Sequence, residues 1–156
     1  MIIINSLSRQ LMKFIILLVS LVIMVVMAAC SAQKAHPDAY AKSKIIFGSG
    51  GGFTGAVTTY CLTEEGQLFK KASMNADWEA VVVSDKKSAQ QCFSIISTID
   101  FNRIILNQPG NRYRFIEYKS DTIDHKVLWG RNKDEVPNEL LILYKLLNDT
   151  IETPKQ

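Results

Sequence analysis

The segment from Lys44 to Leu62, KIIFGSGGGFTGAVTTYCL, is rich in glycine, and its spacing is one that could bind phosphate. Gly50, Gly52 and Gly55 match the pattern G-x-G-x-x-G, in which backbone N–H groups at the start of a helix hold a pyrophosphate. That chemistry needs a helix at the third glycine, whereas the β-branched and aromatic residues 57–60 predict a strand. No Gly-Lys-Ser or Gly-Lys-Thr follows the glycines either. The segment is therefore interpreted as a glycine bend between two strands.

Two structural roles remain open for this bend. A glycine can adopt positive φ without cost, and its missing Cβ allows another part of the chain to come close. The bend is therefore either buried where a helix crosses the sheet or exposed as a rigid recognition loop. In the second case the candidate binding loop comprises Gly50, Gly51, Gly52, Phe53, Thr54 and Gly55.

Three pairs of acidic residues have a spacing that could serve general acid–base catalysis. They are Glu64 with Glu65, Asp121 with Asp124, and Asp134 with Glu135. All of them fall at expected turns or element ends, where a solvated charge is the ordinary outcome. The chain has two histidines, His36 and His125, and the first falls in an expected tether, so no histidine-based metal site is expected. The sequence predicts no catalytic residue, no metal and no cofactor, and the protein is expected not to be an enzyme.

The N-terminal residues predict export. Residues 11–26, LMKFIILLVSLVIMVV, have one cation, Lys13, and then an apolar run that ends in small residues, which is typical of a secretory signal peptide. The following residues, Val26-Met27-Ala28-Ala29-Cys30-Ser31, resemble the bacterial lipobox. The resemblance implies that residues 1–29 are a lipoprotein signal peptide. It also implies that Cys30 carries acyl chains such as palmitate, and two such chains form a stable membrane anchor.

Charge and the residue after Cys30 bear on location and partners. Cleavage before Cys30 removes two cations and no acid, which lowers the formal net charge from +3 to +1. A nearly neutral chain argues against nucleic acid as a partner, because nucleic-acid binding needs a basic face. Ser31, in place of aspartate, is compatible with the outer membrane under the enterobacterial sorting rule. We expect a lipid-anchored protein of the bacterial cell envelope in the outer membrane, with translation starting at either Met1 or Met12.

Cys61 and Cys92 remain after Cys30 is assigned to lipidation. An exported chain meets an oxidising compartment, where the two thiols could pair as a disulfide. Cys61 falls in an expected strand and Cys92 on the apolar stripe of an expected helix, so both could equally be small buried hydrophobic residues. A thiol-dependent enzyme is a further alternative.

The mature chain divides into a tether and one domain. Residues 30–43 are small, polar and interrupted by proline, which is typical of a flexible tether. Residues 44–149 alternate between the two-residue period of strands and the 3.6-residue period of helices. Strands are predicted over residues 45–47, 57–62, 67–71, 112–119 and 125–130, and helices over residues 85–99 and 137–147; residues 78–84 form a fourth strand or lead into the helix. The expected fold is a single α+β domain, with an antiparallel sheet from two hairpins and both helices packed on one face.

Several of these features occur in the same order in a known family. They are Phe47, the segment Gly51-Gly52-Phe53-Thr54-Gly55, the central helix, the aromatic strand Tyr113-Arg114-Phe115, and the final helix Pro137-x-x-Leu140-x-x-Leu143. This order resembles emfourin, the protealysin inhibitor family. The resemblance implies inhibition of thermolysin-like metallopeptidases, although the lipid anchor and the Cys61/Cys92 pair depart from the family pattern and no inhibitory residue is carried over.

Together these features predict an envelope lipoprotein with a non-catalytic, protein-binding domain. Its expected partners are the membrane, through the lipid anchor, and an envelope protein or a peptidase.

Overall fold

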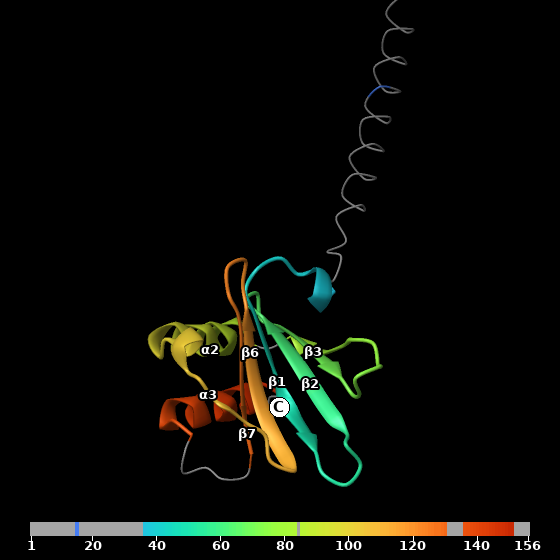
Figure 1. The fold of residues 1–156 in the computed structure, drawn as a ribbon. Coiled ribbons are helices and arrows are strands. Elements are labelled where there is room, and N and C mark those ends of the chain that lie inside the picture. Colours follow the sequence, from blue (N-terminus) through green and yellow to red (C-terminus); the bar gives the residue numbers. More distant parts are fainter. Residues whose placement is uncertain (1–14, 16–35, 84, 131–135, 152–156) are drawn as a thin grey trace, which may run out of the picture. The chain divides into compact units, whose positions relative to one another are not determined.

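The structure, a computed structural model, describes residues 15, 36–83, 85–130 and 136–151 (Figure 1). The predicted signal peptide, apart from Ile15, lies outside the described residues, as do Cys30 and the acid pair Asp134 and Glu135. Among the helices that are described, none has both the length and the hydropathy needed to cross a membrane.

The described residues form a seven-stranded sheet with the order β4-β3-β2-β1-β6-β7-β5. Its strands are β1 (Lys44–Gly51), β2 (Val57–Thr63), β3 (Gln67–Lys71), β4 (Glu79–Val83), β5 (Asn107–Gln108), β6 (Arg112–Lys119) and β7 (Asp124–Trp129). The helices are α2 (Lys86–Thr98) and α3 (Asn138–Asp149), with short 3-10 turns η1 (Pro37–Ala39) and η2 (Phe101–Arg103). The predicted α+β class is confirmed.

The sheet differs from the predicted pair of antiparallel hairpins because it is mixed and has more strands. The hairpins β1–β2 and β6–β7 are present, and β1 pairs antiparallel with β6 to join them. β3 and β4 extend one side antiparallel, whereas β5 pairs parallel with β7 at the other edge. β5 has only two residues, Asn107 and Gln108, so it is too short to show a strand period in the sequence.

Large apolar side chains alternate along the central strands and form the face of the sheet that packs on the helices. Ile45 and Phe47 of β1 are fully buried, and Ile116 and Val127 lie in register with Phe47 on β6 and β7, on the same face. These side chains share one buried cluster with the predicted stripes of the two helices, Ala89, Cys92 and Ile96 of α2 and Leu140, Leu143 and Leu147 of α3. Figure 1 shows both helices beside the sheet on one side.

The helix boundaries follow from local sequence. The Asp85 carboxylate accepts a hydrogen bond from the Lys87 backbone N–H at 3.4 Å, so Asp85 caps α2. Pro137 precedes α3, and its carbonyl accepts hydrogen bonds from the N–H groups of Leu140 and Leu141. Proline is suited to a helix start because the N–H that it lacks has no intrahelical partner there.

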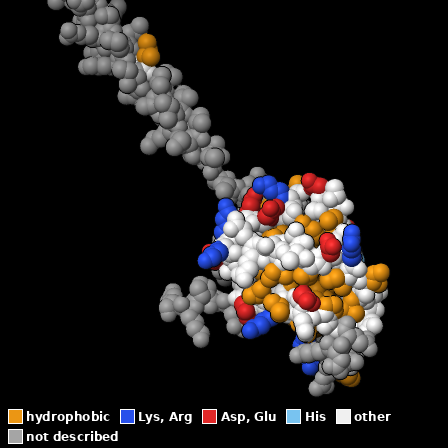
Figure 2. All heavy atoms as spheres, turned by 90° about the vertical axis from the view of Figure 1, so that its left-hand side faces the viewer, with side chains coloured by type: hydrophobic (Ala, Val, Ile, Leu, Met, Phe, Trp, Pro, Cys, Tyr) orange, Lys and Arg blue, Asp and Glu red, His pale blue; other side chains and the backbone are white. Residues whose placement is uncertain are grey.

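α3 presents apolar side chains outward as well as inward. Ile142 is 56% exposed, and Leu141 and Leu146 are partly buried beside the core. Figure 2, which looks onto the helix side, shows hydrophobic side chains gathered on the surface.

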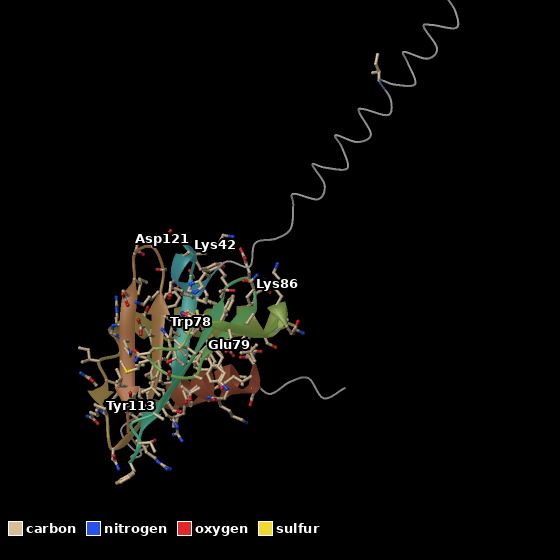
Figure 3. The ribbon with its side chains drawn as sticks, turned by 90° about the vertical axis from the view of Figure 1, so that its right-hand side faces the viewer. Lys42, Trp78, Glu79, Lys86, Tyr113 and Asp121 are labelled. Carbon is tan, nitrogen blue, oxygen red and sulfur yellow. The ribbon has the colours of Figure 1, made fainter. Side chains whose placement is uncertain are left out.

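The segment before β1 packs on the domain. Pro37 and Tyr40 are buried, the Lys44 Nζ donates to the Pro37 carbonyl at 2.6 Å, and the Trp78 indole N–H donates to the Asp38 carboxylate at 3.1 Å. Figure 3 looks onto this side of the molecule. Residues 36–43 were predicted to be part of a flexible tether, and this prediction is wrong. They lie against the sheet because Pro37 and Tyr40 bury their rings.

Candidate binding site: the glycine hairpin and the adjoining cleft

The loop between β1 and β2, residues 52–56, is closed by hydrogen bonds. The Gly51 N–H donates to the Ala56 carbonyl at 3.2 Å, and the Gly55 N–H donates to the Gly52 carbonyl at 3.2 Å. A third bond, from the Gly52 N–H to the Asn111 carbonyl at 2.6 Å, joins the loop to the turn before β6. The backbone of the loop is thus held from inside and from a neighbouring segment.

Gly51 occupies a position that only glycine fits. Its φ is +89°, in the region where a Cβ is strained. A Cβ at this position would also overlap the Asn111 carbonyl oxygen. Gly51 is therefore the point at which the hairpin bends while staying in contact with the neighbouring turn.

Gly50 serves a different purpose, because it lies beneath an aromatic ring. In the register of β1 and β6 it pairs with Tyr113, and a Cβ added to Gly50 would lie 2.7 Å from the Tyr113 hydroxyl oxygen. The missing side chain lets the tyrosine ring cover the strand on the face away from the helices. Gly50 is therefore covered by the Tyr113 ring and not by a helix, whereas the loop that follows it is exposed.

Phe53 lies at the tip of this loop and is fully exposed, at 107%. Two residues beyond it, Gly55 has φ +62° and no atom near the position of a Cβ. The candidate loop that the sequence predicted is therefore divided: Gly50 and Gly51 are packed against β6 and its preceding turn, whereas Phe53, Thr54 and Gly55 face solvent.

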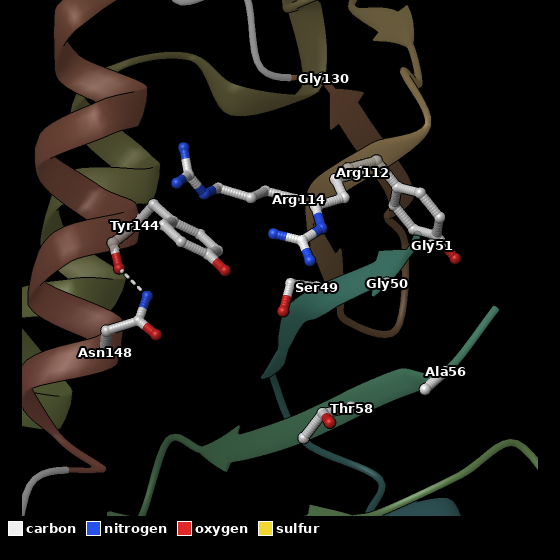
Figure 4. A pocket seen from close by; sticks show the side chains of 11 residues that line it. Ser49, Gly50, Gly51, Ala56, Thr58, Arg112, Arg114, Gly130, Tyr144 and Asn148 are labelled. Carbon is white, nitrogen blue, oxygen red and sulfur yellow. Dashed lines mark hydrogen bonds between the residues drawn. The ribbon is translucent and has the colours of Figure 1, made fainter. Parts of the chain in front are cut away.

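A cleft of about 770 Å³ opens beside the hairpin, between the sheet and α3 (Figure 4). Ser49, Arg114 and Thr58 lie in register on adjacent strands, so their side chains share the face that α3 covers. The cleft is lined by Ser49, Gly50, Gly51, Ala56, Thr58, Arg112, Tyr113, Arg114, Gly130, Tyr144 and Asn148.

α3 supplies the wall of the cleft opposite the sheet. The Tyr144 hydroxyl donates to the Gly48 carbonyl at 3.1 Å, and burial raises the pKa of that phenol. The Asn148 side-chain amide donates to the Tyr144 carbonyl at 2.6 Å. The Arg114 guanidinium carbon lies 5.7 Å from the centre of the Tyr144 ring, within cation–π range. These contacts hold α3 at the end of β1 and place the Tyr144 ring beside Arg114.

This cleft was not predicted from the sequence. Its one local signal was the spacing of Arg112 and Arg114, because residues i and i+2 of a strand share a face. The contribution of Tyr144 and Asn148 had no local signal, since α3 meets the end of β1 only in the folded chain.

Cys61 and Cys92 are free thiols on opposite sides of the sheet, so the disulfide considered for them is absent. Cys61 pairs in register with Ile46, on the face away from the helices, whereas Cys92 belongs to α2 and the helix-side core. Burial raises the pKa of Cys61 to about 12 and that of Cys92 to about 11. Both thiols stay protonated near neutral pH, and the thiol, unlike the thiolate, is a poor nucleophile.

Two of the candidate acidic residues, Glu65 and Asp124, are paired with lysines. Glu65 accepts from the Lys42 Nζ at 2.8 Å, and Asp124 accepts from the Lys119 Nζ at 3.1 Å. A ring nitrogen of His125 donates to the Ile104 carbonyl at 2.9 Å. No group of three or more His, Cys, Asp and Glu side chains that could hold a metal occurs in the described ranges.

No protein-family model matches the chain, and no curated protein matches it. What the domain binds is therefore inferred from the geometry of the hairpin and the cleft.

Proposed function

We propose that this chain is a lipid-anchored protein of the bacterial cell envelope whose domain binds another protein through the tip of the β1–β2 hairpin. The observation that carries the proposal is the fully exposed Phe53 on a hydrogen-bonded loop. Large aromatic side chains dominate the binding energy of many protein interfaces. The anchor rests on the lipobox sequence ending at Cys30, and the outer-membrane location rests on Ser31, which follows it.

The loop has the stiffness that a binding element needs. Ordering a mobile loop on binding subtracts from affinity, whereas a loop already held in one shape avoids that cost. Residues 52–56 are held by the bonds between Gly51 and Ala56, between Gly52 and Gly55, and between Gly52 and Asn111. Phe53 is thus presented from a fixed backbone, as an anchor for a pocket on a partner.

Site-specific photo-cross-linking tests this proposal in the intact cell envelope. A photoreactive phenylalanine analogue replaces Phe53 in the full chain, and the same analogue replaces Met74 as the control. Met74 is also exposed, at 78%, but lies outside the hairpin. We expect a discrete adduct from position 53 and none from position 74; the same adducts from both positions, or none from 53, would contradict the proposal.

A narrower candidate is an inhibitor of thermolysin-like metallopeptidases, as the resemblance to emfourin implies. It is favoured by a short loop that is fixed between two strands and exposes one large apolar residue. Titration of several such peptidases with the full chain in detergent tests it. We expect inhibition by the native chain and at least about tenfold weaker inhibition by Phe53→Ala. Folded chain that inhibits none of these enzymes would leave the partner outside this class.

The anchor has its own test. In cells grown with labelled palmitate, we expect label in the native chain and none in Cys30→Ala, with Cys92→Ala as the matched control that keeps its label. Equal labelling of native chain and Cys30→Ala would refute lipidation at Cys30.

A further inference from the structure

We propose that the cleft between the sheet and α3 binds the phosphate or carboxylate group of a small anionic ligand, held between Arg112 and Arg114. The proposal is independent of the hairpin tip, since it concerns side chains on the helix side of the sheet.

The two arginines are like charges on one face of one strand. Residues i and i+2 of a strand are about 6–7 Å apart along the backbone, so the guanidinium charges of two arginines in these positions repel each other. In Figure 4 both side chains extend into the space between the strands and α3. Of the ion pairs found among the described residues, none involves Arg112 or Arg114. An anion between them would relieve the repulsion.

The cleft contains hydrogen-bond donors and lacks acidic groups. Besides the arginines, the hydroxyls of Ser49 and Thr58 lie on adjacent strands of its floor. No Asp or Glu occurs among its described lining residues. Guanidinium groups bind phosphate and carboxylate oxygens with two parallel hydrogen bonds, and hydroxyls can satisfy the remaining oxygens. The donor set therefore selects an anion and disfavours a cation.

Tyr144 of α3 is held in place on the wall of the cleft opposite the sheet. The Tyr144 ring lies against Arg114, and its hydroxyl is engaged by the Gly48 carbonyl, so the ring orients Arg114 and does not compete for the anion. The volume, about 770 Å³, is in the range of small-molecule pockets. It leaves room for a ligand several times larger than the anionic group itself.

NMR titration of the full chain in a non-ionic detergent tests the inference. The probes are inorganic phosphate and acetate, each compared with chloride at the same ionic strength, and the signals are the side-chain Nε–H groups of the arginines. We expect saturable shifts at Arg112 and Arg114 with phosphate, acetate or both. Saturation with phosphate alone assigns a phosphate-bearing ligand, and saturation with acetate alone assigns a carboxylate.

The variant Arg114→Gln should raise the dissociation constant at least about tenfold, because a charge-assisted pair of hydrogen bonds is lost. Lys87→Gln removes the same charge from the exposed first turn of α2 and should leave the dissociation constant unchanged. Should Arg114→Gln fail to fold, Arg112→Gln, at an exposed position, provides the same test. Shifts equal to those with chloride, or an unchanged constant in the folded arginine variant, overturn the inference.

Discussion

The two central hairpins, β1–β2 and β6–β7, differ in where the large apolar side chain of each turn lies. In the β6–β7 turn, Ile123 is partly buried and lines a cavity beside Phe93 and Tyr118. In the β1–β2 loop, Phe53 contributes nothing to the core and is fully exposed.

Both turns are ordered by hydrogen bonds, so the difference does not come from loose structure. The Ser120 N–H donates to the Ile123 carbonyl at 2.8 Å, and the Ile123 N–H donates to the Ser120 hydroxyl at 3.1 Å. The exposed phenylalanine forgoes about 1.5–3 kcal/mol that burial of such a side chain can contribute. The Phe53 side chain therefore adds nothing to the stability of its ordered turn, and this contrast is the basis of the binding proposal.

The largest expected effect is on the stability of the first hairpin. Gly51→Val places a β-branched residue at φ +89° and forces its Cβ into the Asn111 carbonyl. We expect a loss of about 3 kcal/mol and a fall in Tm of roughly 10–20 °C, measured by thermal unfolding of the full chain in detergent.

Gly55→Val is the matched control for this change. Gly55 also has positive φ, at +62°, but no atom lies near its Cβ position. We expect a smaller loss, about 1–2 kcal/mol, from backbone strain alone. Equal losses in the two variants would show that contact with Asn111 does not hold the hairpin.

A second change tests the packed turn. Ile123→Ala should lower stability by about 1 kcal/mol, because Ile123 is partly buried where it lines a cavity with Phe93 and Tyr118. Thermal unfolding measures the effect, and an unchanged Tm would mean that Ile123 is no better packed than Phe53.

Thiol labelling shows whether the first hairpin opens by itself. Burial raises the pKa of Cys61 and Cys92 well above 8, so neither thiol should react at pH 8 in the folded native chain. In Gly51→Val we expect Cys61, in β2, to be modified faster than Cys92, in α2, as mapped by mass spectrometry. Equal rates would indicate that the whole domain opens together.

The smallest expected effect on stability comes from Phe53→Ala. The side chain is fully exposed, so Tm should change by no more than about 2 °C while binding of the partner is weakened. A clear fall in Tm would show that Phe53 packs on the domain, and would remove the contrast between the two turns.

Local sequence determined the separate elements of this fold. Strand-forming residues predicted β1, β2 and β3, alternation predicted β6 and β7, and the apolar stripes predicted α2 and α3. The strand-forming residues 57–60 correctly excluded a helix after the glycines, and Asp85 and Pro137 marked the two helix starts. These features depend on neighbours along the chain, so the sequence carries them directly.

Only the tertiary structure decided how the elements meet. The pairing of β1 with β6 joins the two hairpins, places Tyr113 over Gly50 and puts Ser49 beside Arg114. The same arrangement separates Cys61 from Cys92 by the thickness of the sheet and brings Tyr144 of α3 to the end of β1. Register between strands distant in the chain depends on the packing of whole faces, which no local period encodes. The cleft, its arginines and the exposed Phe53 follow from that packing.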